Sequence, residues 1–415
     1  MFDRTGSAAV AGGVPRDRLR AALRQPVRRS APVQVAAVTE AEDLRILGGS
    51  WFETRHGPGY RIVSRYDAGF VHGSIPLYEA LRAPLAKLAK LARTAPPAGT
   101  HALRFIDTET TGLAGAGAMV FLAGVARFEG STLILTQYLL PGPAYEGGLL
   151  GGLAEELAAA GGLVSYNGRA FDAPMLETRY VLSRMEAAWR RLPHLDLLHL
   201  TRRIFARDLP SHRLTEVEAR VLAFQRSDDC PSHEAPERYF LFQRTGDPTY
   251  LLPVLRHNAW DVLSLVALLG RLGAIAAGEG EAMVRARAAE WAGEWIEAAH
   301  QYEAAARSGP RALRRQALER AARAFARGGD YEAAVRCWIS LAEEPPGRFL
   351  RPWVEAAKLL EHRLRDVAGA LRCTEAAIDL LQRGLARPGT AGSGTTPGEL
   401  ERRLRRLRRR MGAGV

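Results

Sequence analysis

The middle of the chain contains short apolar runs of the length of β-strands. Residues 103–107, 119–128 and 132–140 are rich in strand-forming residues, and Glu129-Gly130-Ser131 separates the last two runs. Strands joined by such short connections predict an antiparallel meander.

Helical patterns alternate with further strands after this meander. The pattern predicts helices over residues 146–160, 173–190 and 248–272, the last strongly apolar, and short strands at residues 163–166 and 195–197. This order, β-β-β-α-β-α-β-α, predicts a mixed sheet with helices packed on it.

The segment before the meander has a different character. Residues 1–45 are rich in Ala, Arg, Gly, Pro and Val without a steady period, which predicts a mostly disordered arm. Residues 46–100 are a lead-in segment, in which Gly57-Pro58-Gly59 between short apolar runs predicts a hairpin or an irregular turn. We expect a short helix over residues 81–92 and a linker at residues 95–99.

A weak helical repeat begins near residue 282. The motifs Trp295-Ile-Glu-Ala-Ala299, Tyr331-Glu-Ala-Ala-Val335 and Val367-Ala-Gly-Ala-Leu371 recur at a spacing of about 35 to 36 residues. Small residues let paired helices approach closely, so this period predicts an array of helical hairpins of the tetratricopeptide type. An ordinary alanine-rich bundle is the alternative, because the usual Trp and Pro markers of that repeat are incomplete.

These patterns predict an α/β domain followed by an all-α domain. Residues 101–275 form the α/β domain, with a mixed sheet flanked by helices, and residues 282–385 form the helical-repeat domain. Residues 386–415 combine a linker with a basic helix, in which Leu400, Leu404 and Leu407 recur at helical spacing.

Composition excludes several classes of protein. Of the 415 residues, 47% are hydrophobic and 25% are charged, which is typical of globular proteins and excludes a wholly disordered chain. The longest apolar runs are far shorter than the roughly 20 residues that span a bilayer, and the N-terminus lacks the start of a signal peptide. Cys230, Cys337 and Cys373 lie too far apart for a disulfide framework or a zinc site, so we expect a cytoplasmic protein without membrane contact.

The net charge of +12 is concentrated at the two ends of the chain. Residues 1–30 and 399–415 each carry seven Arg and two acids, a net charge of +5 at each end, which leaves +2 for the rest. Such basic arms suit a polyanion such as nucleic acid, although solvated ends can have the same composition.

Candidate chemistry begins at the end of the first strand of the meander, in Phe105-Ile-Asp107-Thr-Glu109-Thr-Thr-Gly112. Asp107 and Glu109 alternate along a strand, so both side chains point to the same face. Burial of two carboxylates is costly unless a cation neutralises them, and a divalent metal would do so. Two acids that simply face water are the alternative.

Two further motifs contribute acids. Tyr166-Asn167-Gly168-Arg169-Ala170-Phe171-Asp172 lies between a strand and a helix, where active sites are common, although an Asn-Gly turn followed by a capping Asp fits the same residues. His257 and Asp261, four residues apart in the apolar helix, share one helical face. An exposed His–Asp pair is the alternative there.

Together these motifs resemble the DEDD superfamily of ribonuclease-H-like exonucleases, and most closely its YprB-type bacterial domain. The matching residues are, in the order of the family's motifs, Asp107 and Glu109, then Asn167, Phe171 and Asp172, and finally Asp261. The resemblance covers residues 101–272 and implies a ribonuclease-H-like fold for the α/β domain.

The resemblance also implies a function. It implies a metal-dependent phosphodiester hydrolase, a 3′–5′ exonuclease acting on DNA or RNA with two Mg²⁺ or Mn²⁺ ions, which suit carboxylate ligands and a two-metal mechanism. The implied metal ligands are Asp107, Glu109, Asp172 and Asp261, with His257 as a further catalytic residue. The implied contacts to the 3′ end of the nucleic acid are Thr110, Asn167, Phe171 and Asn258.

One position departs from the family pattern. DEDD enzymes carry Tyr four residues, or His five residues, before the last Asp, whereas His257 stands four residues before Asp261. His257 is a candidate to orient or deprotonate the attacking water, because histidine titrates near neutrality, and a structural or substrate contact is the alternative.

Residues outside the three motifs are weaker candidates. The resemblance draws attention to Asp196, in His194-Leu195-Asp196-Leu197, as an acid that supports the site, with a surface strand end as the alternative. Arg202, Arg203 and Arg213 are candidates for phosphate contacts, with a solvated helix face as the alternative.

Two other functions fit the same sequence. A non-catalytic adaptor would bind nucleic acid and recruit a protein partner through the helical repeats, and metal-dependent cleavage separates it from the enzyme. A protein-interaction scaffold is the third hypothesis, and it predicts that deleting residues 282–385 removes partner binding without changing nuclease activity. The presence of all four acids favours the enzyme.

Overall fold

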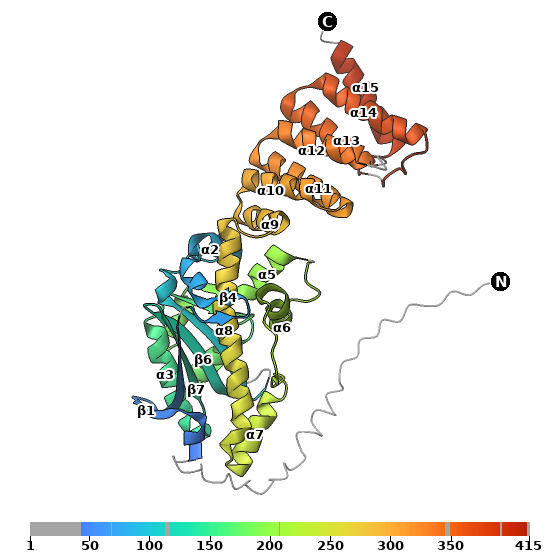
Figure 1. The fold of residues 1–415 in the computed structure, drawn as a ribbon. Coiled ribbons are helices and arrows are strands. Elements are labelled where there is room, and N and C mark those ends of the chain that lie inside the picture. Colours follow the sequence, from blue (N-terminus) through green and yellow to red (C-terminus); the bar gives the residue numbers. More distant parts are fainter. Residues whose placement is uncertain are drawn as a thin grey trace, which may run out of the picture.

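The computed structural model of the chain describes residues 43–67, 69–112, 117–206, 208–344, 349–390 and 392–412. Most of the expected N-terminal arm, residues 1–42, lies outside the described residues. Figure 1 shows an α/β body that is joined at one end to an array of helices.

The α/β body is built on a mixed sheet of seven strands in the order β1-β2-β7-β6-β5-β8-β9. These strands are β1 (Ser50–Thr54), β2 (Gly57–Asp67), β5 (Leu103–Thr110), β6 (Val120–Glu129), β7 (Thr132–Leu139), β8 (Gly162–Ser165) and β9 (His194–Asp196). A separate ribbon pairs β3 (Val71–His72) with β4 (Ile75–Pro76). The predicted fold class, a mixed sheet flanked by helices and followed by a helical region, is confirmed.

The meander and the segment before it form the antiparallel half of the sheet. β5, β6 and β7 pair in sequence order, with Phe105 opposite Ala126 and Val125 opposite Thr136. β2 pairs with all of β7, and β1 pairs with β2. The lead-in segment is therefore built into the sheet, where β2 covers an edge that β7 would otherwise expose.

The other half of the sheet is parallel. β8 pairs in parallel with β5, and β9 pairs in parallel with β8. The carboxyl ends of parallel strands meet at one edge, and ligands of open α/β sheets bind outside that edge. Asp107, the loop of residues 166–171 and Asp196 therefore lie at the same edge of the sheet.

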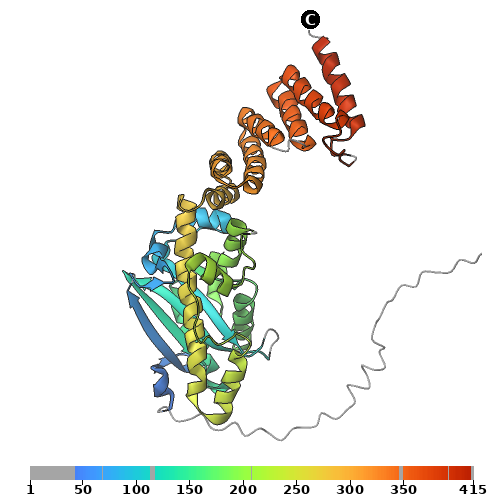
Figure 2. The ribbon, with the colours of Figure 1, turned by 45° about the vertical axis from the view of Figure 1, so that its right-hand side comes forward.

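Helices cover both faces of the sheet (Figures 1 and 2). The α-helices of the body are α2 (Leu85–Ala92), α3 (Glu146–Ala158), α4 (Asp172–Leu182), α5 (Leu197–Phe205), α6 (Leu214–Val217), α7 (Ala235–Thr245) and α8 (Leu252–Ala277). Short 3₁₀ or π turns are η1 (Asp43–Leu47), η2 (Leu77–Arg82), η3 (Thr100–Ala102), η4 (Pro143–Tyr145), η5 (Ala188–Arg191), η6 (Glu218–Leu222) and η7 (Pro248–Leu251). α3 and α4 pack on the face that carries Ile106 and Tyr138, and α2, α5 and α8 pack on the face that carries Phe105 and Leu135.

The long helix α8 is a core element of the body. Among the described residues, Pro248–Ala277 is the single helical stretch long and apolar enough to cross a membrane, with a mean hydropathy of 1.6. However, 67% of its apolar window is buried inside the protein, as in a core helix. Figure 1 shows α8 running along the body. The helix ends at Ala277, five residues later than the pattern predicts, because Gly278 adopts a left-handed conformation with a φ of 111°.

One predicted helix is shorter than expected. The pattern predicts a helix up to residue 190, but α4 ends at Leu182. Arg184 adopts a left-handed conformation with a φ of 55°, which stops the helix. The chain then turns, and Trp189 packs edge-on against Tyr180 at a centroid distance of 6.2 Å.

The close approach of α8 to the sheet depends on a glycine. Gly124 lies opposite Asp107 in the register of β5 and β6. A Cβ atom at Gly124 would lie 2.3 Å from Oδ1 of Asn258 and 3.0 Å from Cγ2 of Val262, both on α8. The first distance is too short for any real contact, so glycine is what lets Asn258 reach the neighbourhood of Asp107.

The described residues from 282 onward contain helices and no strands. These helices are α9 (Ala282–Ala292), α10 (Trp295–Ser308), α11 (Arg311–Gly328), α12 (Tyr331–Glu343), α13 (Leu350–Leu359), η8 (Leu360–Leu364), α14 (Val367–Gln382) and α15 (Pro397–Gly412). Each α-helix packs against the next one in the chain, and Figure 2 shows them stacked beyond the body.

The three repeated motifs each open a helix. α10 begins at Trp295, α12 at Tyr331 and α14 at Val367. Asp330 and Asp366 cap the latter two by accepting a hydrogen bond from the backbone N–H three residues on. The period in the sequence thus corresponds to alternate helices of the array, while the tetratricopeptide assignment stays a prediction.

The first helix of the array shares a core with the α/β body. Val284 and Ala288 of α9 belong to the same hydrophobic cluster as α5 and α8. The buried Arg287 side chain donates to the last two carbonyls of α5 and pairs with Asp208. The array therefore begins on a packed junction and not after a flexible linker.

The basic C-terminal helix α15 packs on the end of the array. Leu400 and Leu407 are fully buried. The carboxylate of Glu361, which is almost fully buried, pairs with three arginines of α15, Arg403, Arg406 and Arg410. Arg402, Arg405 and Arg409 of the same helix are exposed, so part of its positive charge stays at the surface.

We expect Gly124→Ala to lower the free energy of unfolding by about 1–3 kcal/mol, because the added methyl group forces α8 away from β6. Gly99→Ala is the matched control, since a Cβ atom there meets nothing within 4 Å, and its effect should stay within about 0.5 kcal/mol. Urea unfolding measures both, and equal stabilities of the two variants would contradict the packing described here.

Candidate metal centre

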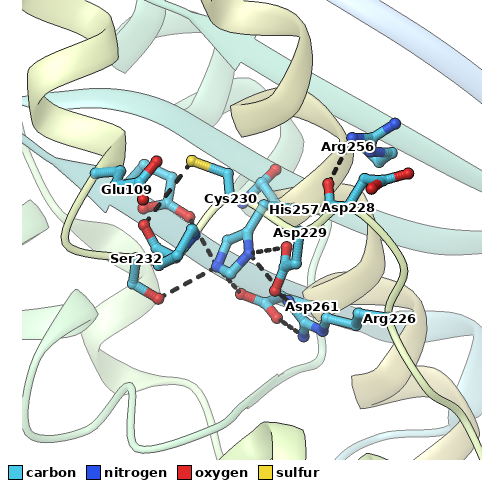
Figure 3. A network of polar contacts seen from close by, with 12 residues as sticks. Glu109, Arg226, Asp228, Asp229, Cys230, Ser232, Arg256, His257 and Asp261 are labelled. Atoms are coloured by element: carbon cyan, nitrogen blue, oxygen red, sulfur yellow. Dashed lines mark hydrogen bonds and ion pairs between the residues drawn. The ribbon is translucent and has the colours of Figure 1, made fainter.

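Four acids from three segments meet at the carboxyl edge of the sheet. Asp107 and Glu109 lie on the face of β5 that packs against α8, as their alternation predicts. Asp172 opens α4 after the loop that follows β8, and Asp261 lies on α8. Figure 3 shows Glu109 and Asp261 on either side of His257.

Asp107 is held by an amide from α8. Nδ2 of Asn258 donates to Oδ2 of Asp107 at 2.9 Å, and Gln137 donates to Oδ1 of Asn258 at 2.9 Å. Asn258 is fully buried, so its amide cannot meet a substrate. The expected role of Asn258 as a substrate contact is therefore wrong, and its place is behind Asp107.

Asp172 is tied to β5 from the opposite face. The Thr108 hydroxyl donates to Oδ1 of Asp172 at 2.5 Å. The preceding loop turns at Asn167, which has a φ of 65°, a conformation that asparagine tolerates well. The Asn-Gly turn considered from the sequence is present, but the Asp172 side chain bonds to Thr108 and does not cap its helix.

Asp196 stabilises this loop by hydrogen bonds to its backbone. Its carboxylate accepts from the backbone N–H groups of Asn167 at 2.8 Å, Arg169 at 3.2 Å and Leu198 at 3.1 Å. Asp196 is only 1% exposed, so the surface strand end considered from the sequence is wrong. The acid acts through the backbone and fixes the loop that leads to Asp172.

His257 faces the acids with its Nε2 atom. Nε2 lies 3.4 Å from Oδ2 of Asp261 and 3.8 Å from Oε1 of Glu109. One ligand atom from each of these three residues falls within 4.8 Å of the other two, which is a geometry that can hold a metal ion. The exposed His–Asp pair considered from the sequence is excluded, because His257 is 3% exposed.

The other imidazole nitrogen has two neighbours of opposite kind. Nδ1 of His257 lies 2.7 Å from Oδ1 of Asp229 and 3.0 Å from Nη1 of Arg226. A carboxylate only accepts and a guanidinium only donates, so Nδ1 can bond to one of them at a time. The shorter contact favours a proton on Nδ1 directed at Asp229, which leaves the lone pair of neutral His257 on Nε2.

Arg226 is the cation of the site, and the sequence analysis did not single it out. Its guanidinium donates to both oxygens of Glu218, at 2.6 and 2.7 Å, and to Oδ1 of Asp261. Burial lowers the pKa of Arg226, but its hydrogen bonds to Glu218 and the charge of Asp261 outweigh this effect and raise that pKa overall. Glu218 is itself buried and accepts from Ser264 at 2.5 Å. A fixed guanidinium thus neutralises one side of Asp261.

The negative charges of the other three acids, Asp107, Glu109 and Asp172, have little compensation from nearby positive charge. Burial, and then repulsion from Asp261 and Asp172, raises the pKa of Asp107 well above its ordinary value. The same causes raise the pKa of Glu109, although the charge of Arg226 opposes the rise. Burial also raises the pKa of Asp172 to about 6, against the hydrogen bond from Thr108.

These observations fit a divalent cation. Converging carboxylates whose charged forms are disfavoured need a positive charge, and Arg226 reaches only one of them. Oxygen ligands are those that Mg²⁺ and Mn²⁺ prefer, and an imidazole nitrogen suits Mn²⁺ as well. Asp107, Glu109, Asp172 and Asp261 are the residues that would hold such ions.

A cavity of about 500 Å³ opens beside the acids. Asn167, His257 and Asp261 line it, together with Arg202 and Arg213, two of the predicted phosphate contacts. The other predicted substrate contacts do not line this cavity. Phe171 is 54% exposed, and the Thr110 hydroxyl donates to the carbonyl of Gly112 at 2.8 Å.

Comparison with known proteins agrees with this arrangement. Residues 104–273 match the model of the RNase H superfamily. The chain is also 33% identical over 288 residues to the uncharacterized protein YprB of Bacillus subtilis (strain 168), an alignment that covers 66% of this chain and 69% of YprB. The matched segment of the superfamily runs from β5 to α8 and contains all four acids.

The raised acid pKa values predict a specific pH dependence of stability. The folded state without metal binds more protons than the unfolded state, so these acids cost stability as the pH rises from about 4 through their folded pKa values. For Asp172, with a folded pKa of about 6, the cost corresponds to about 3 kcal/mol near neutral pH.

We therefore expect Asp172→Asn to raise the melting temperature of the metal-free protein at pH 7.5 and to have little effect near pH 4. Mn²⁺ should raise the melting temperature of the unmodified protein at pH 7.5 and raise that of the variant less. Thermal unfolding with chelator or Mn²⁺ at several pH values measures both effects. A variant that is less stable than the unmodified protein at pH 7.5 would contradict the account.

Proposed function

Because the chain belongs to the RNase H superfamily and is homologous to YprB, we propose that it is a metal-dependent nuclease that hydrolyses phosphodiester bonds of nucleic acid. The observation that carries the proposal is the convergence of four acids from β5, α4 and α8 at the carboxyl edge of the sheet. Superfamily membership supports a nuclease or hydrolase in general. The finer assignment, a DEDD-type exonuclease that starts at the 3′ end, is part of the proposal and depends on the order and spacing of the acids.

Two Mg²⁺ or Mn²⁺ ions are the proposed cofactors. Such ions supply Lewis-acid activation of water and stabilisation of the leaving oxygen. The four acids would bind them, and Asn258 and Thr108 would keep Asp107 and Asp172 in place through the hydrogen bonds described above. Arg226 would hold Asp261 in one orientation from the other side.

His257 is the proposed proton acceptor. Its Nε2 atom faces Glu109 and Asp261. Because Nδ1 contacts Asp229, the lone pair of Nε2 is free to take a proton from the attacking water. Ser232, whose hydroxyl lies 3.3 Å from Nε2, is a partner for this atom when no substrate is present. Asn167 and Phe171 remain proposed contacts to the 3′ end.

A partner for the helical array is a second proposal. α11, α12 and α13 contribute to a cavity of about 1010 Å³ that is lined by Trp338, Phe349 and Leu350 as well as by Arg315 and Arg351. Such a mixed surface suits a protein segment, which is the partner expected of tetratricopeptide-like repeats. A non-catalytic adaptor would use this surface and bind nucleic acid without cleaving it, so a metal-dependent cleavage assay separates the two functions. We propose the cytoplasm as the compartment for either.

The direct test of the nuclease is cleavage of 5′-labelled single-stranded DNA and RNA with Mg²⁺, Mn²⁺ or chelator. We expect a metal-dependent ladder that shortens from the 3′ end. Asp107→Asn should lower the rate by on the order of 10²–10³-fold or more and keep the fold, because the new amide oxygen still accepts from Asn258. Binding of both polymers without cleavage of either would contradict the proposal and favour the adaptor.

The role of Asp229 predicts a second result. Asp229→Asn should lower kcat by about 10–100-fold with a smaller change in KM, and shift the pH profile of kcat, because Nδ1 of His257 loses its carboxylate acceptor. Asp228→Asn is the matched control, since Asp228 is exposed and its side chain makes no hydrogen bond or ion pair with any described residue. Equal effects of the two substitutions would show that Asp229 does not orient His257.

A further inference from the structure

A second, strongly basic cavity lies where the helical array meets the α/β body. It has a volume of about 850 Å³ and is lined by parts of α5, α9, α10 and α11. Six arginines line it, and we call it the arginine cavity: Arg93, Arg202, Arg203, Arg287, Arg320 and Arg327. Glu290 is the single acid in the lining. An accumulation of like charge at a packed junction is unfavourable unless an anion is bound there.

Carboxylates of the described residues neutralise two of these arginines. Arg287 pairs with Asp208, and Arg320 pairs with Glu290 at 3.0 Å. The other four arginines make no ion pair with any carboxylate among the described residues. In addition, Nη1 of Arg203 is buried and has no hydrogen-bond partner there. A buried donor without an acceptor is costly, so this atom is available to a ligand group that accepts hydrogen bonds.

Two tryptophans give the arginine cavity an aromatic component. The guanidinium carbons of Arg93 and Arg203 lie 5.4 Å and 4.8 Å from the centre of the Trp291 ring, and Arg327 lies 4.8 Å from that of Trp295. Trp291 is 42% exposed, which is unusual for so large an apolar side chain. Guanidinium groups beside an exposed indole ring, here that of Trp291, are the combination that binds phosphates and stacks bases of single strands.

The arginine cavity is connected to the metal centre through one residue. Arg202 lines both this cavity and the smaller cavity at His257 and Asp261. α5, which carries Arg202, therefore lies between the acids and the junction. A polymer that leaves the acids along α5 meets the free guanidinium groups of the arginine cavity next.

We propose that the arginine cavity binds the single-stranded nucleic acid whose end is held at the four acids. Phosphates would bind Arg93, Arg203 and Arg327, and a base would stack on Trp291. This inference rests on the proposed function, since it extends the substrate path of that site. An acidic protein segment is the other ligand that fits the charge, but the exposed indole and the shared Arg202 favour the nucleic acid.

The test compares binding of short and long single strands to the full chain carrying Asp107→Asn, which prevents cleavage during the measurement. Fluorescence anisotropy with strands of about 5 and about 20 nucleotides, of both sugars, gives the affinity at several salt concentrations. The cavity variant is Arg93→Gln/Arg327→Gln. Its matched control is Arg307→Gln/Arg336→Gln, which removes the same charge from exposed arginines of α10 and α12 outside the cavity.

We expect the cavity variant to lose at least about tenfold in affinity for the long strand and to lower the salt slope by roughly 1.4, as expected for two lost phosphate contacts. The short strand should bind with nearly unchanged affinity. Trp291→Ala should weaken the long strand by about tenfold as well. The control should bind both strands as the parent does.

Three results would overturn the inference. The first is a cavity variant that binds the long strand like its control. The second is displacement of the long strand by polyglutamate as effectively as by unlabelled strand, which would assign the cavity to an acidic protein. The third is a parent protein that binds no single strand. If the length-dependent affinity depends on the cavity but the unmodified protein cleaves nothing, the nuclease proposal fails and the inference about the cavity stands.

Discussion

The main constraint on the α/β body is the repulsion among four carboxylates at one edge of its sheet, which the surrounding residues must withstand. These carboxylates are those of Asp107, Glu109, Asp172 and Asp261. Burial raises the pKa of Asp107, Glu109 and Asp172, and repulsion within the cluster raises that of Asp107 and Glu109 further, so these ionised forms are disfavoured without a cation. A protein gains nothing in stability from such a cluster. Its presence at the edge where α/β sheets bind ligands is explained by a function that needs concentrated negative charge, and the proposed binding of metal ions is such a function.

The surrounding residues keep the acids in place against this repulsion. Gly124 lets α8 approach β6, so that Asn258 can bond to Asp107. On the other side of the sheet, Asp196 holds the loop that precedes Asp172 through three backbone N–H groups. Arg226 balances Asp261 but is anchored by the buried Glu218, so its charge stays at one side of the cluster. The acids are thus fixed while the space between them is left for a cation.

Much of this could be predicted from local patterns, and the remainder depends on tertiary packing. Strand lengths and short connections predict the meander, and alternation along β5 predicts that Asp107 and Glu109 share a face. Arg226 could not be recognised, because it is one arginine of many, and its segment carries no period that shows which helix it contacts. Asn258 was expected to contact the substrate, but it lies behind Asp107. A helical period cannot tell which side of α8 meets the sheet. The sequence patterns likewise did not predict the bounds of α5, α6 and α7. Without α5, the connection between the two cavities could not be predicted either.

The central claim is that the four acids form a metal site, and the most direct measurement is a crystal structure of the protein grown with Mn²⁺, with anomalous data collected at the manganese edge. The account predicts strong anomalous peaks enclosed by Asp107, Glu109, Asp172 and Asp261, with Arg226 still bonded to Glu218. An ordered site without any anomalous peak at saturating Mn²⁺ would contradict it.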